Sequence, residues 1–175
     1  MNIRNAVRVF AFKEDKVACI RYKNTTKDYY DIPGGKIETG ETEVQTCIRE
    51  FKEETGMNVD NLDYIGVIKT IYPDKNKVFN LKVYIGNNVI GSPKELEENY
   101  SYWMPISELI EKDKRFAITH LLDKDLIKYF DTKGFDITFI CDENHNIINV
   151  SVNEPGEKEL KNKYSLTRKN NQNMF

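Results

Sequence analysis

The stretch from residue 35 to residue 57 constrains this chain most, because it carries the start, the apolar face and the end of one helix. Thr42 can cap the helix, and Gln45, three residues later, can reach back to it as in a capping box. Apolar residues then recur at the spacing of one helical face, at Val44, Cys47, Ile48 and Phe51. Gly56 stands where a left-handed residue would end the helix. These signals predict a helix over residues 42–55.

Three glutamates, Glu50, Glu53 and Glu54, fall on the opposite face of this predicted helix. Like charges three and four residues apart destabilise a helix unless something neutralises them. Mg²⁺ prefers oxygen ligands and commonly bridges protein carboxylates to substrate phosphates. The glutamates therefore indicate either a metal site or a solvated acidic face, and taken alone they do not decide between the two.

A glycine loop precedes the helix, at Pro33, Gly34 and Gly35. Glycine lets other groups approach the backbone closely. A carbonyl of this loop could give a metal ion a further oxygen ligand, and the start of the following helix favours anions. Loop and helix together are therefore typical of a place where a metal ion and a phosphate group meet.

The fixed positions of this stretch resemble the Nudix box, and every defined position of the box is matched. These positions are Gly35, Glu41, Arg49, Glu50, Phe51, Glu53, Glu54, Gly56 and Met57. The approach to the box, residues 33–42, is similar to that of the MutT-like branch of the family. The resemblance covers residues 30–57 and implies a Nudix hydrolase, with an α/β/α sandwich around a mixed β-sheet as its fold.

The resemblance also implies roles for single residues. The implied ligands of Mg²⁺ or Mn²⁺ are Gly35, Glu50, Glu53 and Glu54. The implied catalytic residues, a glutamate base and an arginine that orients carboxylates, are Glu50, Glu53 and Arg49. The implied substrate contacts are Gly34, Lys36 and Glu38. The residues that would hold the motif itself together are Glu41 and Gly56.

Alternating and apolar runs outside the motif predict the remaining elements of an α/β fold. The predicted strands are residues 3–12, 17–22, 62–72, 78–85, 135–141 and 146–152. The further predicted helices are a short one at 105–110 and an amphipathic one at 118–130. Helices on both faces of a mixed sheet fit the sandwich.

The chain is long enough for one domain with a small appendage. Residues 1–132 are expected to form the Nudix domain. Residues 133–154 are expected to form a C-terminal β-hairpin extension packed on it, and residues 155–175 a polar, partly disordered tail. The hairpin could serve as an extra sheet edge, a dimer contact or a lid near the substrate.

Charge and cysteine usage exclude several other classes of protein. A net charge of −2 over 175 residues marks no surface built for polyanions, so nucleic acid is a disfavoured partner. The three cysteines are scattered and lack metal-ligand spacing. No signal peptide and no run of transmembrane length is visible, so a cytoplasmic protein without membrane contact is expected.

Two positions outside the box bear on the base and the substrate. Relatives often place a glutamate before a Trp-x-Pro strand, but here Tyr102 directly precedes Trp103. Glu97 or Glu98 could substitute, or both could belong to an exposed acidic turn, so the identity of the base stays open. Pro73 lies where ADP-ribose-cleaving relatives often carry a proline, although a proline in a turn needs no such explanation.

The favoured reaction is cleavage of a nucleoside triphosphate to its monophosphate and pyrophosphate by metal-activated water, with a small nucleotide as the partner. ADP-ribose or another nucleotide sugar is the next substrate class. A Nudix domain that senses a nucleotide without cleaving it is the competing class, and the complete box disfavours it. A homodimer is compatible with the sequence.

Overall fold

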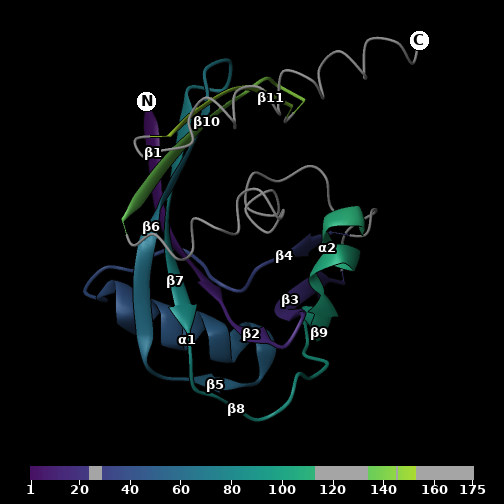
Figure 1. The fold of residues 1–175 in the computed structure, drawn as a ribbon. Coiled ribbons are helices and arrows are strands. Elements are labelled where there is room, and N and C mark those ends of the chain that lie inside the picture. Colours follow the sequence, from purple (N-terminus) through teal and green to yellow (C-terminus); the bar gives the residue numbers. More distant parts are fainter. Residues whose placement is uncertain (24–28, 113–133, 145, 153–175) are drawn as a thin grey trace.

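The computed structural model describes residues 1–23, 29–112, 134–144 and 146–152. Its largest sheet has five strands, in the order β1 (Asn2–Phe10), β7 (Lys77–Gly86), β6 (Leu62–Tyr72), β10 (Phe135–Cys141) and β11 (Ile147–Val152) (Figure 1). β1 pairs with β7 and β6 with β10 in parallel, whereas the other neighbours are antiparallel. The sheet is therefore mixed, as the sequence predicts.

A second sheet is built around β3 (Lys16–Tyr22). β2 (Phe12–Lys13), β4 (Tyr30–Asp31) and β9 (Asn99–Pro105) all pair with β3 in antiparallel fashion. A short ribbon joins β5 (Asn58–Val59) to β8 (Val89–Ile90). This layout puts the end of β3 and the start of β4 beside each other, next to the glycine loop that follows β4.

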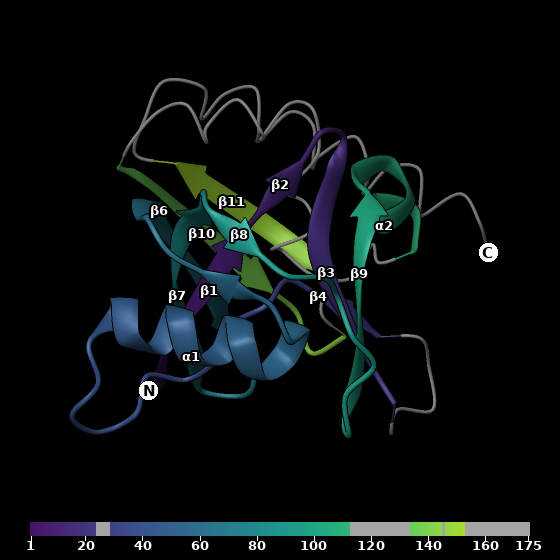
Figure 2. The ribbon, with the colours of Figure 1, turned by 90° about the horizontal axis from the view of Figure 1, so that it is seen from below.

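Two helices fall among the described residues, α1 (Glu43–Thr55) and α2 (Ile106–Lys112). α1 contacts β1, β3, β5 and β9, and so bridges the two sheets, whereas α2 follows and contacts β9 (Figure 2). The short helix predicted at 105–110 is confirmed as α2, with both ends shifted. The helix predicted at 118–130 lies outside the described residues.

The single strand predicted at residues 3–12 is wrong, because the chain changes sheets within it. β1 ends at Phe10 and pairs with β7, while β2 begins at Phe12 and pairs with β3. Ala11 lies between them, is fully buried, and accepts a hydrogen bond from the Ala18 N–H at 2.9 Å. A small side chain fits this crossing, and simple alternation along the sequence does not reveal it.

The predicted C-terminal hairpin is present as β10 and β11. β10 pairs in parallel with β6, from Phe135 beside Gly66 to Ile140 beside Ile71. Of the roles that the sequence left open for the hairpin, this pairing is that of an extra sheet edge. Its inward side chains, such as Phe135 and Phe139, are fully buried and complete the core against the second sheet.

Two hydrophobic cores lie on opposite faces of the five-stranded sheet. The larger lies between the two sheets and includes Phe10, Ile32, Ile68, Met104 and Phe139. The smaller lies under α1 and includes Val7, Val9, Cys47 and Phe51. Successive side chains of β1 therefore alternate between the cores, and the face of β1 that carries Arg8 turns away from α1.

The apolar stripe predicted for α1 is partly wrong. Cys47 and Phe51 are fully buried, but Val44 and Ile48 are 44% and 41% exposed. The buried face is completed instead by Thr46 and Thr55, whose hydroxyls bond the backbone carbonyls of Thr42 at 3.1 Å and Phe51 at 2.5 Å. Because these threonines bond their own helix, they can be buried without leaving a polar group unpaired. α1 is thereby rotated so that Glu50 and Glu54 face the glycine loop.

Both predicted ends of α1 are confirmed. The Gln45 N–H donates to the Thr42 hydroxyl at 3.2 Å, and the Thr42 N–H donates to the Gln45 side chain at 2.9 Å. At the other end Gly56 has φ 73° and its N–H donates to the Lys52 carbonyl. Glu43 in the first turn accepts hydrogen bonds from Lys82 and, at 2.6 Å, from the Tyr84 hydroxyl, which fixes the helix start to β7.

Replacing Tyr84 by phenylalanine should lower the free energy of unfolding by about 1.5 kcal/mol, the usual contribution of a hydrogen bond to a charged group. Chemical denaturation followed by circular dichroism measures the change. Tyr64→Phe is the matched control, because the Tyr64 ring packs edge-on against Tyr84 while its hydroxyl makes no hydrogen bond to the described residues. Equal stability of the two variants would contradict this role for the Tyr84–Glu43 bond.

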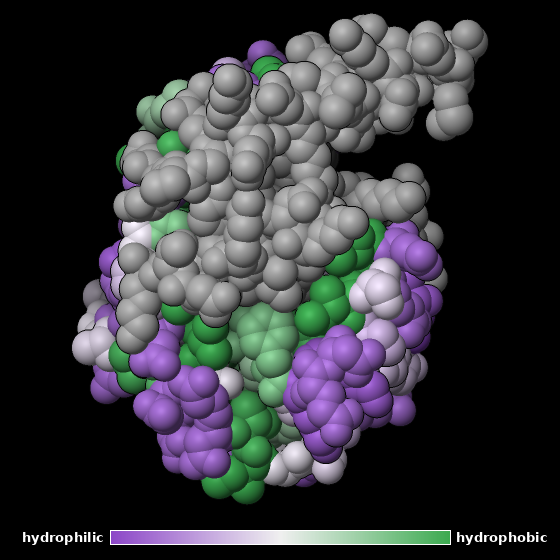
Figure 3. Space-filling model, viewed as in Figure 1, coloured by the Kyte–Doolittle hydropathy of each residue, from purple (hydrophilic) through white to green (hydrophobic). Residues whose placement is uncertain are grey.

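Hydrophobic side chains also remain on the surface. Ile3 and Ile90 are each 58% exposed. Figure 3 shows hydrophobic residues between two hydrophilic groups on one face. Such exposure is normal because polar side chains are too few to cover a folded protein, and we assign it no role. Within the described part of the chain, no helix is long and apolar enough to cross a membrane.

Candidate active site

The glycine loop lies along the edge of β1. The Val7 N–H donates to the Gly35 carbonyl at 2.9 Å, and the Val9 N–H donates to the Pro33 carbonyl at 2.8 Å. Gly34 lies between them with φ 149°, and a Cβ at this position would come within 2.2 Å of the Val7 carbonyl oxygen. Only glycine allows this approach, so the loop is held on β1 by its sequence.

Glu50 lies directly against the loop. A Cβ placed on Gly35 would come within 2.2 Å of Glu50 Oε1, so the carboxylate occupies the space that any side chain at position 35 would need. Only 16% of the Glu50 side chain is exposed. The Gly35 carbonyl accepts one hydrogen bond from Val7 and keeps a second lone pair, since a carbonyl oxygen has two.

Glu54 lies deeper, between the loop and β3. Its Oε2 accepts a hydrogen bond from the Gly34 N–H at 2.8 Å, and its Oε1 accepts one from the Tyr22 hydroxyl at 3.2 Å. Burial raises the pKa of Glu54 to about 7, and the negative charges of Asp31 and Glu50 act in the same direction. The Gly34 N–H and the Arg8 charge oppose that shift and do not outweigh it.

Arg49 connects the carboxylates of the motif. Its Nε and Nη2 donate to the two oxygens of Glu41 at 2.7 and 2.9 Å, in the bidentate geometry that suits a guanidinium. Its Nη1 donates to Glu50 at 2.9 Å and to Glu53 at 3.1 Å. These bonds raise the pKa of Arg49, and the bond from Arg49 lowers the pKa of Glu41 to about 2.

Glu53 is bonded to the same Arg49 nitrogen as Glu50, whereas Glu54 has other partners. The Glu53 side chain is 60% exposed and bonds Arg49, whereas Glu54 bonds the loop. Across the residues that the structure describes, no three carboxylate, thiol or imidazole groups come close enough together to hold a metal ion. Arg49 holds Glu50 and Glu53 on its guanidinium, and Glu54 is held by the Gly34 N–H and the Tyr22 hydroxyl.

The donors that do meet suit a hard divalent cation. Glu50 and Glu54 both border the glycine loop, and Glu50 contributes to the raised pKa of Glu54, which places two carboxylates within electrostatic reach of each other. Carboxylate and backbone carbonyl oxygens are the ligands that Mg²⁺ takes in proteins. Glu50, Glu54 and the Gly35 carbonyl therefore fit the ion, and Glu53 would fit it after leaving Arg49.

A cavity of about 620 Å³ opens beside these residues. Glu50, Glu54, Gly34 and Gly35 line it together with four aromatic residues, Tyr22, Tyr29, Tyr72 and Phe79. Cavities of this size, with an apolar lining and a few placed polar groups, are typical of small-molecule sites. We call this space the main cleft.

A buried ion pair forms the inner polar group of the main cleft. Arg8 donates to Asp31 Oδ2 at 3.0 Å and to the Val7 carbonyl at 3.1 Å, and the Ile32 N–H donates to Asp31 Oδ1 at 2.7 Å. Burial disfavours the charge on Arg8, but Asp31, Glu54 and Tyr22 together outweigh burial and raise the pKa of Arg8. Arg8 therefore stays charged beside Glu54.

The structure separates the three predicted substrate contacts. Gly34 and Lys36 line the main cleft, whereas Glu38 is exposed and is not part of its lining. Glu97 and Glu98, the two residues considered as a base, are exposed and do not line the cleft either. The base therefore stays a prediction, carried by the glutamates of α1.

Sequence reasoning missed the residues that come to the site from the strands. Arg8, Tyr22 and Asp31 all line the main cleft, and Arg8 and Tyr22 contact Asp31 and Glu54 respectively. One signal was available: Arg8 interrupts an apolar strand between two valines. A lone charge there predicts a buried partner, but the sequence does not tell which of the distant carboxylates it will meet.

The raised pKa of Glu54 predicts a pH-dependent stability for the protein without metal. A carboxyl group whose pKa is higher in the folded state contributes stability that is complete below its unfolded pKa, about 4.5, and is lost as the pH rises through about 7. In EDTA the free energy of unfolding should therefore fall by up to about 3 kcal/mol between pH 4.5 and pH 8.

Thermal unfolding of the wild type and of Glu54→Gln across this pH range tests the expectation. The variant has no group to ionise at position 54. As the pH rises, the melting temperature of the wild type should therefore fall relative to that of the variant. Parallel curves for both proteins would show that Glu54 does not titrate near neutral pH.

The comparisons with known proteins point to one family. A model of the NUDIX domain matches residues 2–124. An oxidized purine nucleoside triphosphate hydrolase from Danio rerio is 32% identical over 109 residues, which are 59% of this chain and 70% of that protein. A putative 8-oxo-dGTP diphosphatase from Bacillus subtilis, YtkD, is 42% identical over 96 residues, 50% of this chain and 56% of that protein.

A solved structure agrees with the fold. The crystal structure of a mutator MutT protein from Bacillus halodurans has a TM-score of 0.72 to this chain at 20% identity. The match covers 87% of this chain and 99% of that one. The mixed sheet and its helices are therefore those of MutT structures, and the likeness includes residues beyond the motif from which the fold was predicted.

Proposed function

Because this chain belongs to the Nudix family, in which hydrolysis of a nucleotide diphosphate bond is the reaction class, we propose that its substrate is a nucleoside triphosphate. The products would be the monophosphate and pyrophosphate. Two relatives favour this class by name, the oxidized purine nucleoside triphosphate hydrolase and the putative 8-oxo-dGTP diphosphatase. An oxidised purine is therefore the first base to test.

One observation carries the proposal: Glu50 and Glu54 line the same cleft as the glycine loop. A diphosphate in that cleft would lie beside both carboxylates and beside the backbone of Gly34 and Gly35. The aromatic rings of Tyr22, Tyr29 and Tyr72 line the remainder of the cleft, where a nucleobase could stack. The cleft thus offers one environment to phosphates and another to a base.

The proposed cofactor is Mg²⁺ or Mn²⁺, held by Glu50, Glu54 and the Gly35 carbonyl, with Glu53 as a further ligand. When bound, the metal would neutralise phosphate oxygens and make water a stronger nucleophile at neutral pH. Glu50 or Glu53 would then accept the proton of the attacking water. Neither role needs a residue that lies outside α1 and its loop.

Arg49 is proposed as a positioning residue and not as a contact for the substrate. Its guanidinium is fully engaged by Glu41, Glu50, Glu53 and the Lys36 carbonyl. Because Glu41 holds it in a bidentate pair, Arg49 can fix the direction of the Glu50 carboxylate. It would thereby keep Glu50 beside the loop before any substrate arrives.

A turnover screen tests the proposal. The protein would be incubated with Mg²⁺ or Mn²⁺ and a panel of dNTPs, 8-oxo-dGTP, ADP-ribose, sugar nucleotides and dinucleoside polyphosphates, and the products would be separated. Release of pyrophosphate from a triphosphate is the expected result. Turnover only of ADP-ribose or a sugar nucleotide would replace the substrate class. Tight binding of a nucleotide without turnover would make the protein a sensor.

The sequence also predicts a partner, an oligomeric state, a location and a C-terminal tail. A small nucleotide is the proposed partner, and the homodimer and the cytoplasmic location stay predictions. The separation of residues 155–175 as a tail concerns residues outside those that the structure describes.

A further inference from the structure

A second cavity, of about 490 Å³, adjoins the outer end of the main cleft. The two cavities share four lining residues, Arg4, Lys36, Lys77 and Phe79. We call the three cations among them, Arg4, Lys36 and Lys77, the basic rim. They come from three separate segments, the first strand of the chain, the residue after the glycine loop and the start of β7, so the fold brings them together.

The basic rim carries charge without local compensation. Arg4, Lys36 and Lys77 are exposed, and none of them forms an ion pair with the other described residues. Among the described residues that line the second cavity, none has a carboxylate. The main cleft, in contrast, is lined by three carboxylates, those of Glu50, Glu54 and Asp31, of which Asp31 is paired with Arg8. The charge along the connected cavities therefore changes from acidic to basic.

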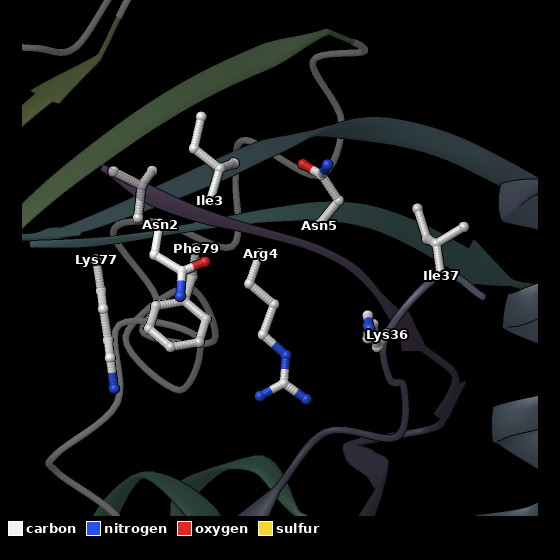
Figure 4. Close-up of a pocket in the computed structure, with 9 residues that line it drawn as sticks. Asn2, Ile3, Arg4, Asn5, Lys36, Ile37, Lys77 and Phe79 are labelled. Atoms are coloured by element: carbon white, nitrogen blue, oxygen red, sulfur yellow. The ribbon is translucent and has the colours of Figure 1, made fainter. Parts of the chain in front are cut away.

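Figure 4 shows how the rim is arranged. Arg4 and Lys77 extend on the same side of the strands, with the Phe79 ring between them, and Lys36 stands on the adjoining loop. Ile3 and Asn5 point to the other side, as alternation along β1 requires. Arg4 and Lys77 thus face the space that continues the main cleft.

The order of residues gives the rim a direction relative to the reaction centre. Lys36 directly follows Gly35, and the Glu50 carboxylate occupies the space that a Cβ on Gly35 would need. A phosphate chain that starts beside Glu50 and leaves the main cleft would pass Lys36 first and then reach Arg4 and Lys77. An anionic chain suits this route, because unpaired cations bind phosphate oxygens through charge-assisted hydrogen bonds.

We propose that the basic rim is a subsite for an oligophosphate leaving group. This rests on the proposed function, because it takes the bond that is cleaved to lie beside Glu50 and Glu54. Substrates whose leaving group carries two or more phosphates are preferred over substrates that release a sugar phosphate. Two kinds of substrate carry such a phosphate chain. It forms the terminal phosphates of a nucleoside triphosphate and the bridge of a dinucleoside polyphosphate.

Binding of inorganic triphosphate in EDTA tests the subsite without turnover. Isothermal titration calorimetry would compare the wild type with Arg4→Ala/Lys77→Ala, a double variant at two exposed positions. We expect the variant to bind about tenfold more weakly, as two partly solvated charge contacts imply. The affinity of the wild type for triphosphate should also fall more steeply with added salt than that of the variant.

Two further variants make the binding test specific. Lys13→Ala removes an exposed lysine of β2 that lines neither cavity, and it should bind like the wild type. Arg4→Lys/Lys77→Arg keeps both charges and should retain binding. An affinity of the Ala/Ala variant within twofold of the wild type would overturn the proposal, as would an equal loss in Lys13→Ala.

Kinetics then identify the source of the phosphate chain. The ratio of kcat/KM for a nucleoside triphosphate to that for a sugar nucleotide should fall about tenfold in the Ala/Ala variant, mainly through KM. The same ratio measured with a dinucleoside tetraphosphate tells whether the bridging chain is bound better than the terminal one. Equal losses for all three substrates would overturn the subsite. No turnover of any substrate, with triphosphate binding that still depends on the rim, would overturn the proposed function and leave the rim in place.

Discussion

Glu54→Gln should lower kcat by about three orders of magnitude, the scale of a lost electrostatic or metal contact at a reaction centre. Glu54 is a partly buried carboxylate, and both of its oxygens accept hydrogen bonds, from the Gly34 N–H and from the Tyr22 hydroxyl. An amide at this position cannot neutralise a cation. Steady-state kinetics on the substrate found by the turnover screen, at saturating Mg²⁺, measure the loss.

The same variant should fold normally. Glutamine has the shape of glutamate, and its side-chain oxygen can still accept the hydrogen bond from the Gly34 N–H. Circular dichroism and thermal unfolding at pH 8 would verify this, and the variant should be at least as stable as the wild type. Glu143→Gln, at an exposed position in the β10–β11 turn, is the control for kcat. Retention of more than a tenth of kcat by Glu54→Gln would contradict the role of Glu54.

The parts of the fold that depend on neighbours in sequence could be predicted. The capping box at Thr42, the left-handed Gly56 and the strand β6 each follow from residues within a few positions, and the structure confirms all three. The glycine loop was predicted for the same reason. What the sequence does not contain is the reason for two successive glycines, because the atoms that crowd them, on Val7 and Glu50, lie far along the chain.

The rotation of α1 shows a limit of periodicity. Val44 and Ile48 have the right spacing for a buried stripe, yet the helix buries Thr46 and Thr55 instead. Two demands compete: the apolar stripe favours one orientation, and the bonds of Arg49 and Glu54 to the loop region favour another. Hydrophobic spacing alone predicts the first. The second orientation leaves no threonine hydroxyl unpaired, because the hydroxyls of Thr46 and Thr55 bond the helix backbone.

The cleft was beyond sequence reasoning for a related cause. Most of its residues come from β1, β3, β4, β6 and β7, so pairing between strands decides which of these side chains meet. Arg8 and Asp31 are 23 positions apart, and Tyr22 and Glu54 are 32 apart. The motif predicts the chemistry of the glutamates and the glycine loop. The residues that would distinguish substrates come from the strands, and strand pairing decides their positions.

Gly35→Ala should lower kcat/KM by about two orders of magnitude while the protein stays folded, since small displacements of a reacting group cost this much. The new Cβ would lie 2.2 Å from Glu50 Oε1, which is the end of a flexible side chain, so Glu50 must move away from the loop. Gly35 does not need a positive φ, so alanine strains the backbone little. Steady-state kinetics and thermal unfolding together measure the two effects.

Gly34→Ala is the informative comparison, because its outcome should be the reverse. Its Cβ would meet the Val7 carbonyl oxygen at 2.2 Å, and φ is 149°, so the clash is with backbone and cannot be relieved by a rotamer change. This variant should lose about 3 kcal/mol or more of stability. If Gly35→Ala instead unfolded as readily as Gly34→Ala, the Glu50 side chain would be unable to move away from the new Cβ. If Gly35→Ala kept full activity, the position of Glu50 beside the loop would not matter for the reaction. Either result would remove the link between the second glycine and catalysis.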